Sequence, residues 1–301
     1  MTDGAPRGAA ETLLLGTISL DRYLGSAVVL PGGGILNMAW HWRNLERPFG
    51  VVTRVGADDG GPILAFLDRH AIAAVGDAVV APGRSSSIDI AIRPDRQPDM
   101  QNFVAGAWDG FRTTPAERST LAAARRLHVV LTEGAVAELA RLGGEGVLAH
   151  LEVSADFLGF RHYDLERLAA TMGRVDLGFI GWPGDADASE VRGMRDVAFA
   201  LRRLLVVTMG SRAIRVFDGR SGPSERRYEV TPVEVAGTTL GCGDAFIAWF
   251  LDELFRSRDI DRAIERGKAG GALVTGWVRP LPDDAYLTPA TDALPTSLRT
   301  T

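Results

Sequence analysis

The chain is poor in cysteine, in long apolar runs and in runs of like charge. Its one cysteine, Cys242, excludes an internal disulfide and a cysteine-based zinc site, and favours a reducing compartment. No stretch reaches the roughly 18 apolar residues of a membrane span, and residues 1–10 are polar and rich in Gly and Pro rather than signal-like. With 33 basic against 38 acidic residues, a nucleic-acid or anionic-membrane partner is disfavoured. We expect a cytoplasmic protein that binds small molecules.

The sequence does contain a regular alternation of strand and helix patterns. Its 46% apolar content over 301 residues suffices for one large core. Helices are predicted at 37–45 and 62–70, where apolar residues recur at helical spacing. Strand, helix and strand in succession give a mostly parallel sheet with helices on both faces and ligand sites at the carboxyl ends of the strands. Strands are predicted at 13–18, 50–55, 127–131, 147–153, 175–180 and 204–208.

Two segments depart from this alternation. Residues 23–30 follow the first strand without room for a helix, and 86–92 alternate Ile88, Ile90 and Ile92 with small or polar residues. Period-two alternation is typical of a half-exposed sheet, so we predict a small antiparallel lid. The isoleucines need a cover, which is either the lid of a second subunit, giving a homodimer, or their own domain.

The expected domain organisation follows from these patterns. One α/β domain spans 11–290, with lid strands from about 21–32 and 84–106. Residues 1–10 and 291–301 are expected to be flexible ends, and the Pro- and Thr-rich tail from residue 280 onward to be an irregular strap.

The strongest chemical signal is the segment GTTLGCGDAF at 237–246, which opens a largely apolar helix. A Gly-rich turn leaves the N–H groups of Gly241, Cys242, Gly243 and Asp244 free, at the positive end of the helix dipole, where they can hold a phosphoryl group. Asp244 is then placed to deprotonate an attacking hydroxyl. An ordinary loop that ends in an N-cap aspartate is the alternative reading. We interpret Cys242 as a small residue in a tight turn rather than a reactive thiol.

A second Gly-rich segment, GGGILNMA at 32–39, joins the lid to the first long helix. Gly32 and Gly33 allow a ligand to approach closely, and Asn37 offers both a donor and an acceptor to a sugar hydroxyl. The alternative is a glycine hinge followed by a solvent-facing Asn.

Together these segments resemble the ribokinase (PfkB) family of carbohydrate kinases. GTTLGCGDAF is similar to the family's Asp-Thr-x-Gly-Ala-Gly-Asp signature, and GGGILNMA to its Gly-Gly-x-x-x-Asn-x-Ala substrate motif. VGADDGG at 55–61 matches the family's Val-Gly-x-Asp-x-x-Gly turn, and VTMG at 207–210 its Val-Thr-x-Gly. The motifs occur in the family's order over more than 220 residues.

The resemblance implies a three-layer αβα fold with a β-sheet lid and an ATP-dependent sugar kinase that uses Mg²⁺. It makes Asp244 the general base and the turn formed by Gly241, Cys242 and Gly243 the anion hole. It also implies substrate contacts from Asp21, Gly32, Gly33 and Asn37, and nucleotide contacts from Thr208, Gly210 and Thr239.

Three departures from the family pattern affect its ion sites. Thr238 replaces the signature's leading aspartate, which helps bind a monovalent cation in relatives, so potassium dependence is left open. The family's Asn-x-x-Glu, which orders Mg²⁺ through water, is absent after residue 181, and Asp187 is the nearest carboxylate. Glu152 stands where many relatives carry an aspartate that faces the phosphates. Asp187 and Glu152 are therefore the candidate metal contacts, and solvated surface charges are the alternative.

Other functions remain open at this stage. A nucleoside kinase of the same family is the nearest rival, and a nucleotide- or sugar-binding regulatory protein that no longer turns over is another. A dinucleotide-dependent oxidoreductase is disfavoured because no Gly-x-Gly-x-x-Gly follows the first strand. The middle and C-terminal thirds resemble bacterial fructoselysine 6-kinases in overall similarity, without a diagnostic motif. The sugar and the hydroxyl that is phosphorylated are not specified by the sequence.

Overall fold

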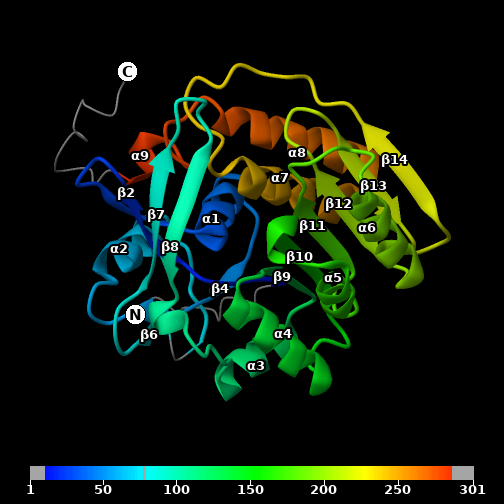
Figure 1. Cartoon of the computed structure of the whole chain (residues 1–301). Helices are drawn as coiled ribbons and strands as arrows, with labels where there is room; N and C mark the ends of the chain where they lie inside the picture. The colour runs from blue at the N-terminus through cyan, green and yellow to red at the C-terminus, as the bar shows by residue number, and fades with distance from the viewer. Residues whose placement is uncertain (1–10, 77–78, 287–301) are drawn as a thin grey trace.

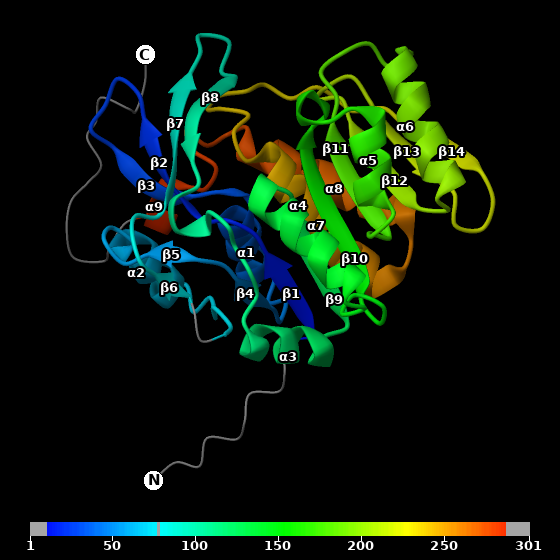
Figure 2. The same cartoon turned by 60° about the horizontal axis from the view of Figure 1, so that its bottom comes forward.

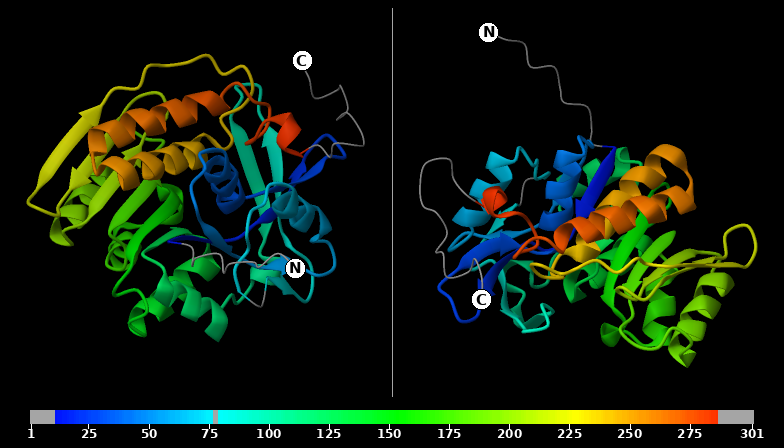
Figure 3. Two further views of the ribbon diagram at one scale, coloured as in Figure 1. Left: turned by 180° about the vertical axis from the view of Figure 1, so that it is seen from behind. Right: turned by 90° about the horizontal axis from the view of Figure 1, so that it is seen from above.

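A computed structural model describes residues 11–76 and 79–286 of the chain. A central sheet lies between two layers of helices, and a small sheet stands beside it (Figures 1 and 3). The three-layer α/β fold with a separate lid sheet, expected from the sequence, is confirmed. The flexible ends predicted at 1–10 and 291–301 lie outside the described residues.

The central sheet is parallel except at one edge. Over the described residues, its eight strands run in the order β14-β13-β12-β11-β10-β9-β1-β4, and only β13 and β14 are antiparallel to their neighbours. The strand Leu204–Thr208 is nearly all aliphatic because helices cover both of its faces. The bounds are β1 Thr12–Leu15, β4 Gly50–Val52, β9 Arg126–Val130, β10 Glu152–Gly159, β11 Leu177–Gly181, β12 Leu204–Thr208, β13 Ile214–Asp218 and β14 Ser224–Tyr228.

Each face of this sheet has its own helical layer (Figure 2). Alternate residues of one strand serve the two cores: Leu14 packs with the first layer, and Leu13 and Leu15 with the second. The first layer holds α1 Gly34–Asn44, α2 Gly61–Arg69, α7 Cys242–Ser257, α8 Ile260–Val274 and the short α9 Asp283–Tyr286. The second holds α3 Pro115–Ala123, α4 Glu133–Gly144, α5 Leu165–Met172 and α6 Ser189–Ala200, and short 3₁₀ turns lie at Gly106–Trp108 and Phe160–His162.

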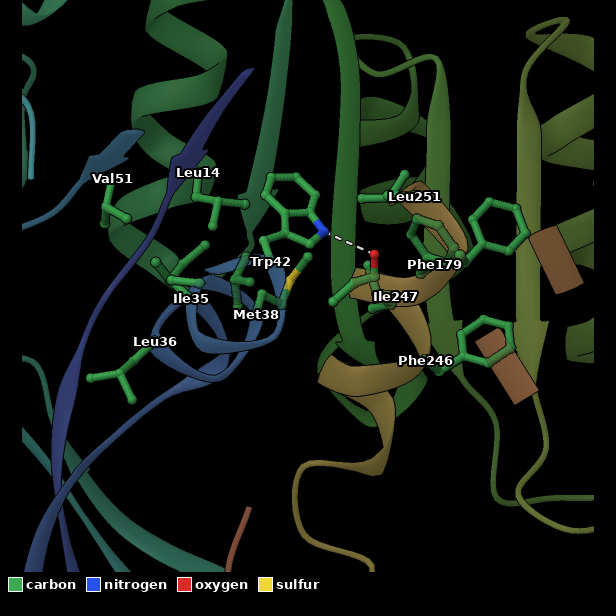
Figure 4. Close-up of a cluster of buried hydrophobic side chains, with 14 of the residues drawn as sticks. Leu14, Ile35, Leu36, Met38, Trp42, Val51, Phe179, Phe246, Ile247 and Leu251 are labelled. Carbon is green, nitrogen blue, oxygen red and sulfur yellow. Dashed lines mark hydrogen bonds between the residues drawn. The ribbon is translucent and has the colours of Figure 1, made fainter. Parts of the chain in front are cut away.

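Helices α1 and α7 are joined in the middle of the first core (Figure 4). The fully buried indole of Trp42 donates a hydrogen bond of 2.8 Å from Nε1 to the carbonyl oxygen of Ala248. Apolar side chains such as Met38 and Leu251 surround this bond. A satisfied polar group in an apolar core fixes the position of one helix against the other.

The lid is a four-stranded sheet in the order β3-β2-β7-β8. The expectation of an antiparallel lid is correct for two of its three strand pairs and wrong for the third, because β2 and β7 are parallel. The segment between these two strands contains the whole of α1 and α2, and after it the chain re-enters the lid in the same direction. The bounds are β2 Ser19–Tyr23, β3 Val29–Gly32, β7 Ser86–Ile92 and β8 Pro98–Val104, and a separate pair is formed by β5 Val55–Gly56 and β6 Val80–Ala81.

The isoleucines of β7 are covered by the chain's own domain. Ile90 is 1% exposed and packs with Tyr23 of the lid and with Leu240, which lies just before α7. Ile88 and Ile92 are half-buried against the same cluster. The sequence left open whether a second subunit or the chain's own domain covers these isoleucines, and in the structure it is the chain's own domain.

Two sequence-based expectations of local structure are wrong. The strand predicted at 147–153 begins only at Glu152, because Val147 and Leu148 lie in turns after α4 and cover its end rather than extend the sheet. The tail predicted to be an irregular strap contains α9, and its remainder from residue 287 lies outside the described residues. Over the described residues, no helix combines the length and apolar character required to cross a bilayer.

Candidate active site

The amino end of α7 forms an open cradle of backbone N–H groups. Gly241 is the N-cap with φ 84°, a left-handed conformation that favours glycine. Among the described residues, no hydrogen-bond acceptor contacts the N–H groups of Gly241, Gly243 or Asp244. The N–H of Cys242 differs from expectation, since it donates to the carbonyl of Thr239 at 3.2 Å. Gly243 is exposed and faces open space, so an anionic group has room to approach.

The Asp244 carboxylate links the two Gly-rich segments of the sequence. Its Oδ2 accepts a 2.7 Å hydrogen bond from Nδ2 of Asn37, which lies on α1 and is 4% exposed. Burial raises the pKa of Asp244 to about 6, and the Asn37 bond opposes the rise. A carboxylate with this pKa is able to accept a proton near neutral pH. Asn37 keeps its Oδ1 without a partner among the described residues.

Asp21 faces the same space from the lid. It is 5% exposed, accepts a 2.7 Å hydrogen bond from the Ser19 hydroxyl, and packs directly on Gly32. A Cβ at position 32 would lie 2.0 Å from Oδ2 of Asp21, so only glycine fits there. Burial raises the pKa of Asp21 to about 7, the Ser19 bond lowers it, and the charge of Asp244 adds to the rise.

Asp21 belongs to the lid sheet and not to the central sheet. It lies inside lid strand β2 and not at the end of the first sheet strand, which stops at Leu15. Gly33, the next residue after Gly32, caps the amino end of α1. Asp21, Gly32, Gly33 and Asn37 thus gather where the lid meets α1, beside Asp244.

A third carboxylate at this site, Asp156, is absent from the sequence-based candidates. It lies near the carboxyl end of β10, is 6% exposed, and accepts a hydrogen bond of 2.8 Å from the N–H of Leu158. Burial raises the pKa of Asp156 to about 7, and the charge of Asp244 adds to the rise. Because the strand was predicted to end at residue 153, the carboxylate near its true end at Gly159 was missed.

Glu152 is placed at the wrong end of the same strand to serve as a phosphate or metal contact. It is the first residue of β10, where it pairs with Arg126 at 3.2 Å and with Arg258 at 2.9 Å. The amino ends of parallel strands lie across the sheet from the carboxyl ends that bear Asp156. The role expected for Glu152 is therefore contradicted, and Asp156 is the carboxylate of β10 that faces Asp244.

The β7–β8 hairpin rests on the loop that leads into α7. The carbonyl oxygen of Arg96 accepts from the Thr238 hydroxyl and from the Thr239 N–H, both at 3.2 Å. The Thr239 hydroxyl donates to Oε1 of Gln97 at 2.9 Å. Thr239, expected to contact nucleotide, is thus engaged by the lid, and the lid is closed over the amino end of α7.

The remaining expected contacts lie along the carboxyl edge of the sheet. Thr208 ends β12, and Gly210 follows it with φ 62° and an exposed position. The Asp187 side chain is 83% exposed, in the loop after β11, and lies 3.5 Å from Nη1 of Arg215. Over residues 11–76 and 79–286, no group of three or more His, Cys, Asp or Glu side chains is arranged to hold a metal ion. The donor set therefore does not fit a cage for Mg²⁺ made by protein side chains alone.

A cluster of aromatic side chains packs beside the loop that leads into α7. The carbonyl of Trp277 accepts the Thr238 N–H at 2.8 Å, and its ring stacks on His41 of α1 with centroids 6.1 Å apart. Trp249 of α7 donates to Nδ1 of His41 at 3.3 Å. Burial lowers the pKa of His41 to about 4, so the ring is neutral at physiological pH. The cluster joins α1, α7 and the loop after α8.

Comparison with known proteins found a family model that matches part of the chain and solved structures that share its fold. Residues 178–278 match the model for the pfkB family carbohydrate kinase. None of the curated proteins compared by sequence matches the chain.

Solved structures resemble the chain over most of its length, at identities that show the fold alone. A microbiome-derived acarbose kinase is 21% identical with a TM-score of 0.71, covering 89% of this chain and 93% of its own. A Burkholderia thailandensis nucleoside kinase in complex with inosine is 19% identical, with a TM-score of 0.69 and coverage of 89% and 92%. Adenosine kinase from Schistosoma mansoni is 13% identical, with a TM-score of 0.77 and coverage of 92% and 98%.

The family match and the fold agree with the resemblance found in the sequence. Both sugar kinases and nucleoside kinases occur among the similar structures, so they do not separate these two substrate classes. Residues 178–278 are thus similar to the pfkB family carbohydrate kinases, and the fold of the chain is the one seen in ribokinase-like sugar and nucleoside kinases.

Proposed function

We propose that this protein transfers the γ-phosphoryl group of ATP to a hydroxyl of a small sugar or sugar derivative, with Asp244 as general base. The observation that carries the proposal is the contact between Asn37 and Asp244, 207 residues apart. It brings the substrate motif and the phosphate motif into one site. Neither a glycine hinge nor an isolated N-cap aspartate requires that contact.

The reaction assigns a role to each group at the head of α7. The substrate hydroxyl lies between Asp244 and the γ-phosphorus, Asp244 takes its proton, and the freed oxygen attacks phosphorus as the bond to ADP breaks. The free N–H groups of Gly241, Gly243 and Asp244 donate to the phosphoryl oxygens in transit. Asn37 and Asp21 hold the sugar, and the closed lid excludes water that would compete as acceptor.

Mg²⁺, which is typical of the family, neutralises phosphate charge when it is bound with ATP. Because no cage of carboxylates is present among the described residues, we propose that it is held by phosphate oxygens and water. Asp187 remains the candidate for a water-mediated contact. We expect the protein to work in the cytoplasm, where ATP is available.

Dimerisation through the lids is proposed on the lid's exposed apolar side chains. Phe103 is 45% and Val104 52% exposed on β8, an edge strand with unpaired backbone groups. Light scattering of the purified protein would detect the dimer, and a charged substitution such as Phe103→Glu should return it to a monomer.

ATP consumption against matched panels of sugars and nucleosides tests the activity itself. Phosphorylation of a sugar but not of adenosine or inosine supports the proposal, whereas the reverse assigns a nucleoside kinase. Binding of ATP and a sugar without any turnover would instead identify a regulatory binding protein.

A further inference from the structure

Arg279 is a buried cation for which the reaction as described has no use. It lies in the segment between α8 and α9, and its side chain is 2% exposed. Nη1 forms an ion pair with the Asp283 carboxylate, whereas Nη2 has no hydrogen-bond partner among the described residues. Leaving an N–H of a buried charged group unpaired is costly, so such groups are usually satisfied in the working state of a protein.

The guanidinium lies against the substrate-facing side of the lid. Its central carbon is 5.9 Å from the centre of the Tyr23 ring. Tyr23 is two residues after Asp21 on β2, so the two side chains share one face of the lid sheet. The lid strand therefore covers Arg279, and movement of that strand would expose it to an entering substrate.

The neighbours of Arg279 connect it to the rest of the site. Pro280, the next residue, packs against Gly241 at the anion cradle. A Cβ added at position 241 would lie 2.8 Å from the Cα of Pro280. The charges of both Asp21 and Arg279 act on the pKa of Tyr286, the first raising it and the second lowering it. Arg279 thus lies against the lid strand that carries Asp21, and its neighbour Pro280 lies against the cradle.

The ion pair with Asp283 does not satisfy this guanidinium. The Asp283 side chain is 42% exposed, so its charge is screened by water, and it occupies only one of the two terminal nitrogens. The candidate active site itself is rich in carboxylates, since Asp21 and Asp156 both lie close enough to Asp244 for its charge to raise their pKa values. A neutral sugar needs no buried cation there, whereas an acidic substrate does, because the carboxylates would repel it.

We propose that Arg279 binds an oxyanionic group of the substrate, a carboxylate or a phosphate, at a distance from the hydroxyl that is phosphorylated. The preferred substrates are then acidic sugar derivatives rather than neutral sugars. The assignment rests on the proposed kinase function and names the substrate class of the same site. A guanidinium offers two parallel N–H donors to an oxyanion, which a hydroxyl acceptor cannot match.

Comparing the binding of neutral and acidic sugars tests the role of Arg279 without requiring turnover. Calorimetry with a non-hydrolysable ATP analogue compares glucose with gluconate and ribose with ribose 5-phosphate, so that the two pairs separate carboxylate from phosphate. In at least one pair, the acidic member should bind the parent protein tenfold more tightly or better. A parent protein that binds neither acidic member more tightly than its neutral counterpart overturns the proposal.

Two variants separate substrate binding from bracing of the fold. Arg279→Met keeps the length of the side chain without its charge, and should weaken binding of the acidic member about 10–100-fold, with a smaller effect on the neutral member. Asp283→Asn removes the ion pair but retains the guanidinium, and should keep the acidic preference. If Arg279→Met loses affinity equally for the acidic and the neutral member of a pair, or if Asp283→Asn loses the preference for the acidic member, Arg279 is a structural brace and the assignment is refuted.

The same data distinguish this proposal from the kinase function. If the acidic preference depends on Arg279 but no phosphorylated product forms, the kinase function fails and the binding site stands. If product forms from neutral sugars alone, the kinase function stands and the role of Arg279 fails. Arg279→Lys serves where the methionine variant does not fold, and it should recover part of the acidic preference through its retained charge.

Discussion

The two ends of strand β10 carry carboxylates in opposite situations. At the amino end, Glu152 is partly exposed and paired with Arg126 and Arg258. At the carboxyl end, four residues later, Asp156 is buried near Asp244 and forms no ion pair with any of the described residues, and its pKa is raised to about 7. The charge at one end of the strand is compensated, and the charge at the other end is not.

The difference indicates which edge is shaped by stability and which by chemistry. Burying a carboxylate without a counter-charge costs stability, so gathering Asp21, Asp156 and Asp244 in one site lowers the stability of the fold. Raised pKa values let these groups hold or release a proton near neutral pH. The paired amino edge offers no such group at Glu152.

The largest expected effect follows from removing the base at the carboxyl edge. Asp244→Asn should lower kcat by about 10²–10⁴-fold, because the amide cannot accept the hydroxyl proton, while the affinity for ATP changes little. Steady-state kinetics and nucleotide titration measure the two quantities. Glu152→Gln is the matched control at the amino edge and should keep kcat within twofold to threefold. An equal loss of kcat in both variants would contradict the assignment of catalysis to the carboxyl edge.

Loss of the lid carboxylate should affect sugar binding more than catalysis. Asp21→Ala removes hydrogen bonds to a charged group, which are worth about 1.5–3 kcal/mol, or roughly 10–150-fold in the sugar KM. The KM for ATP should change by less than threefold. Similar changes in both constants would show that Asp21 acts on the whole closed site rather than on the sugar.

The pH dependence of turnover sharpens the comparison further. Because the pKa of Asp244 is about 6, its base form is lost as pH falls through 6. The kcat/KM should therefore fall about tenfold for each pH unit below 6 and reach a plateau above about 7. A profile that is flat from pH 5 to 8 would exclude Asp244 as the titrating base.

The smallest effects should be opposite changes in stability from the two ends of β10. The folded pKa of Asp156, about 7, exceeds its ordinary value of 3.8, so stability is lost as pH rises from about 4 to 7. Asp156→Asn should stabilise the fold by about 1–3 kcal/mol at pH 8 and by much less at pH 4. Glu152→Gln should instead cost about 0–1 kcal/mol. Urea unfolding at both pH values measures these differences, and destabilisation by Asp156→Asn at pH 8 would contradict the argument.

The sequence predicted the layers of the fold because its signals were local. Aliphatic strands and amphipathic helices alternate with enough regularity to specify an αβα arrangement, and the Gly-rich turn before α7 identified Asp244 as the candidate base. The contact between Asn37 and Asp244 was not predicted, because no pairwise signal in one sequence connects residues 207 apart.

What was missed depended on strand ends and on tertiary contacts. An aliphatic run at 147–153 placed the strand about five residues too early, and so exchanged the carboxyl-edge Asp156 for the amino-edge Glu152. The parallel pairing of β2 with β7 depends on the length of chain between them and leaves no pattern within either strand. That Nη2 of Arg279 lacks a hydrogen-bond partner within residues 11–76 and 79–286 depends on packing, which a single sequence does not reveal.

The hydrogen bond from Trp42 to Ala248 has a consequence for evolution. It fixes α1 to α7, so Asn37 and Asp244 belong to one rigid body that tolerates little change. The lid is held by a small cluster in which Tyr23 and Ile90 pack on Leu240, with a few half-buried neighbours. Mutations can therefore accumulate in the lid at little cost to folding, and new acceptor molecules can be explored while the phosphoryl-transfer apparatus is inherited unchanged.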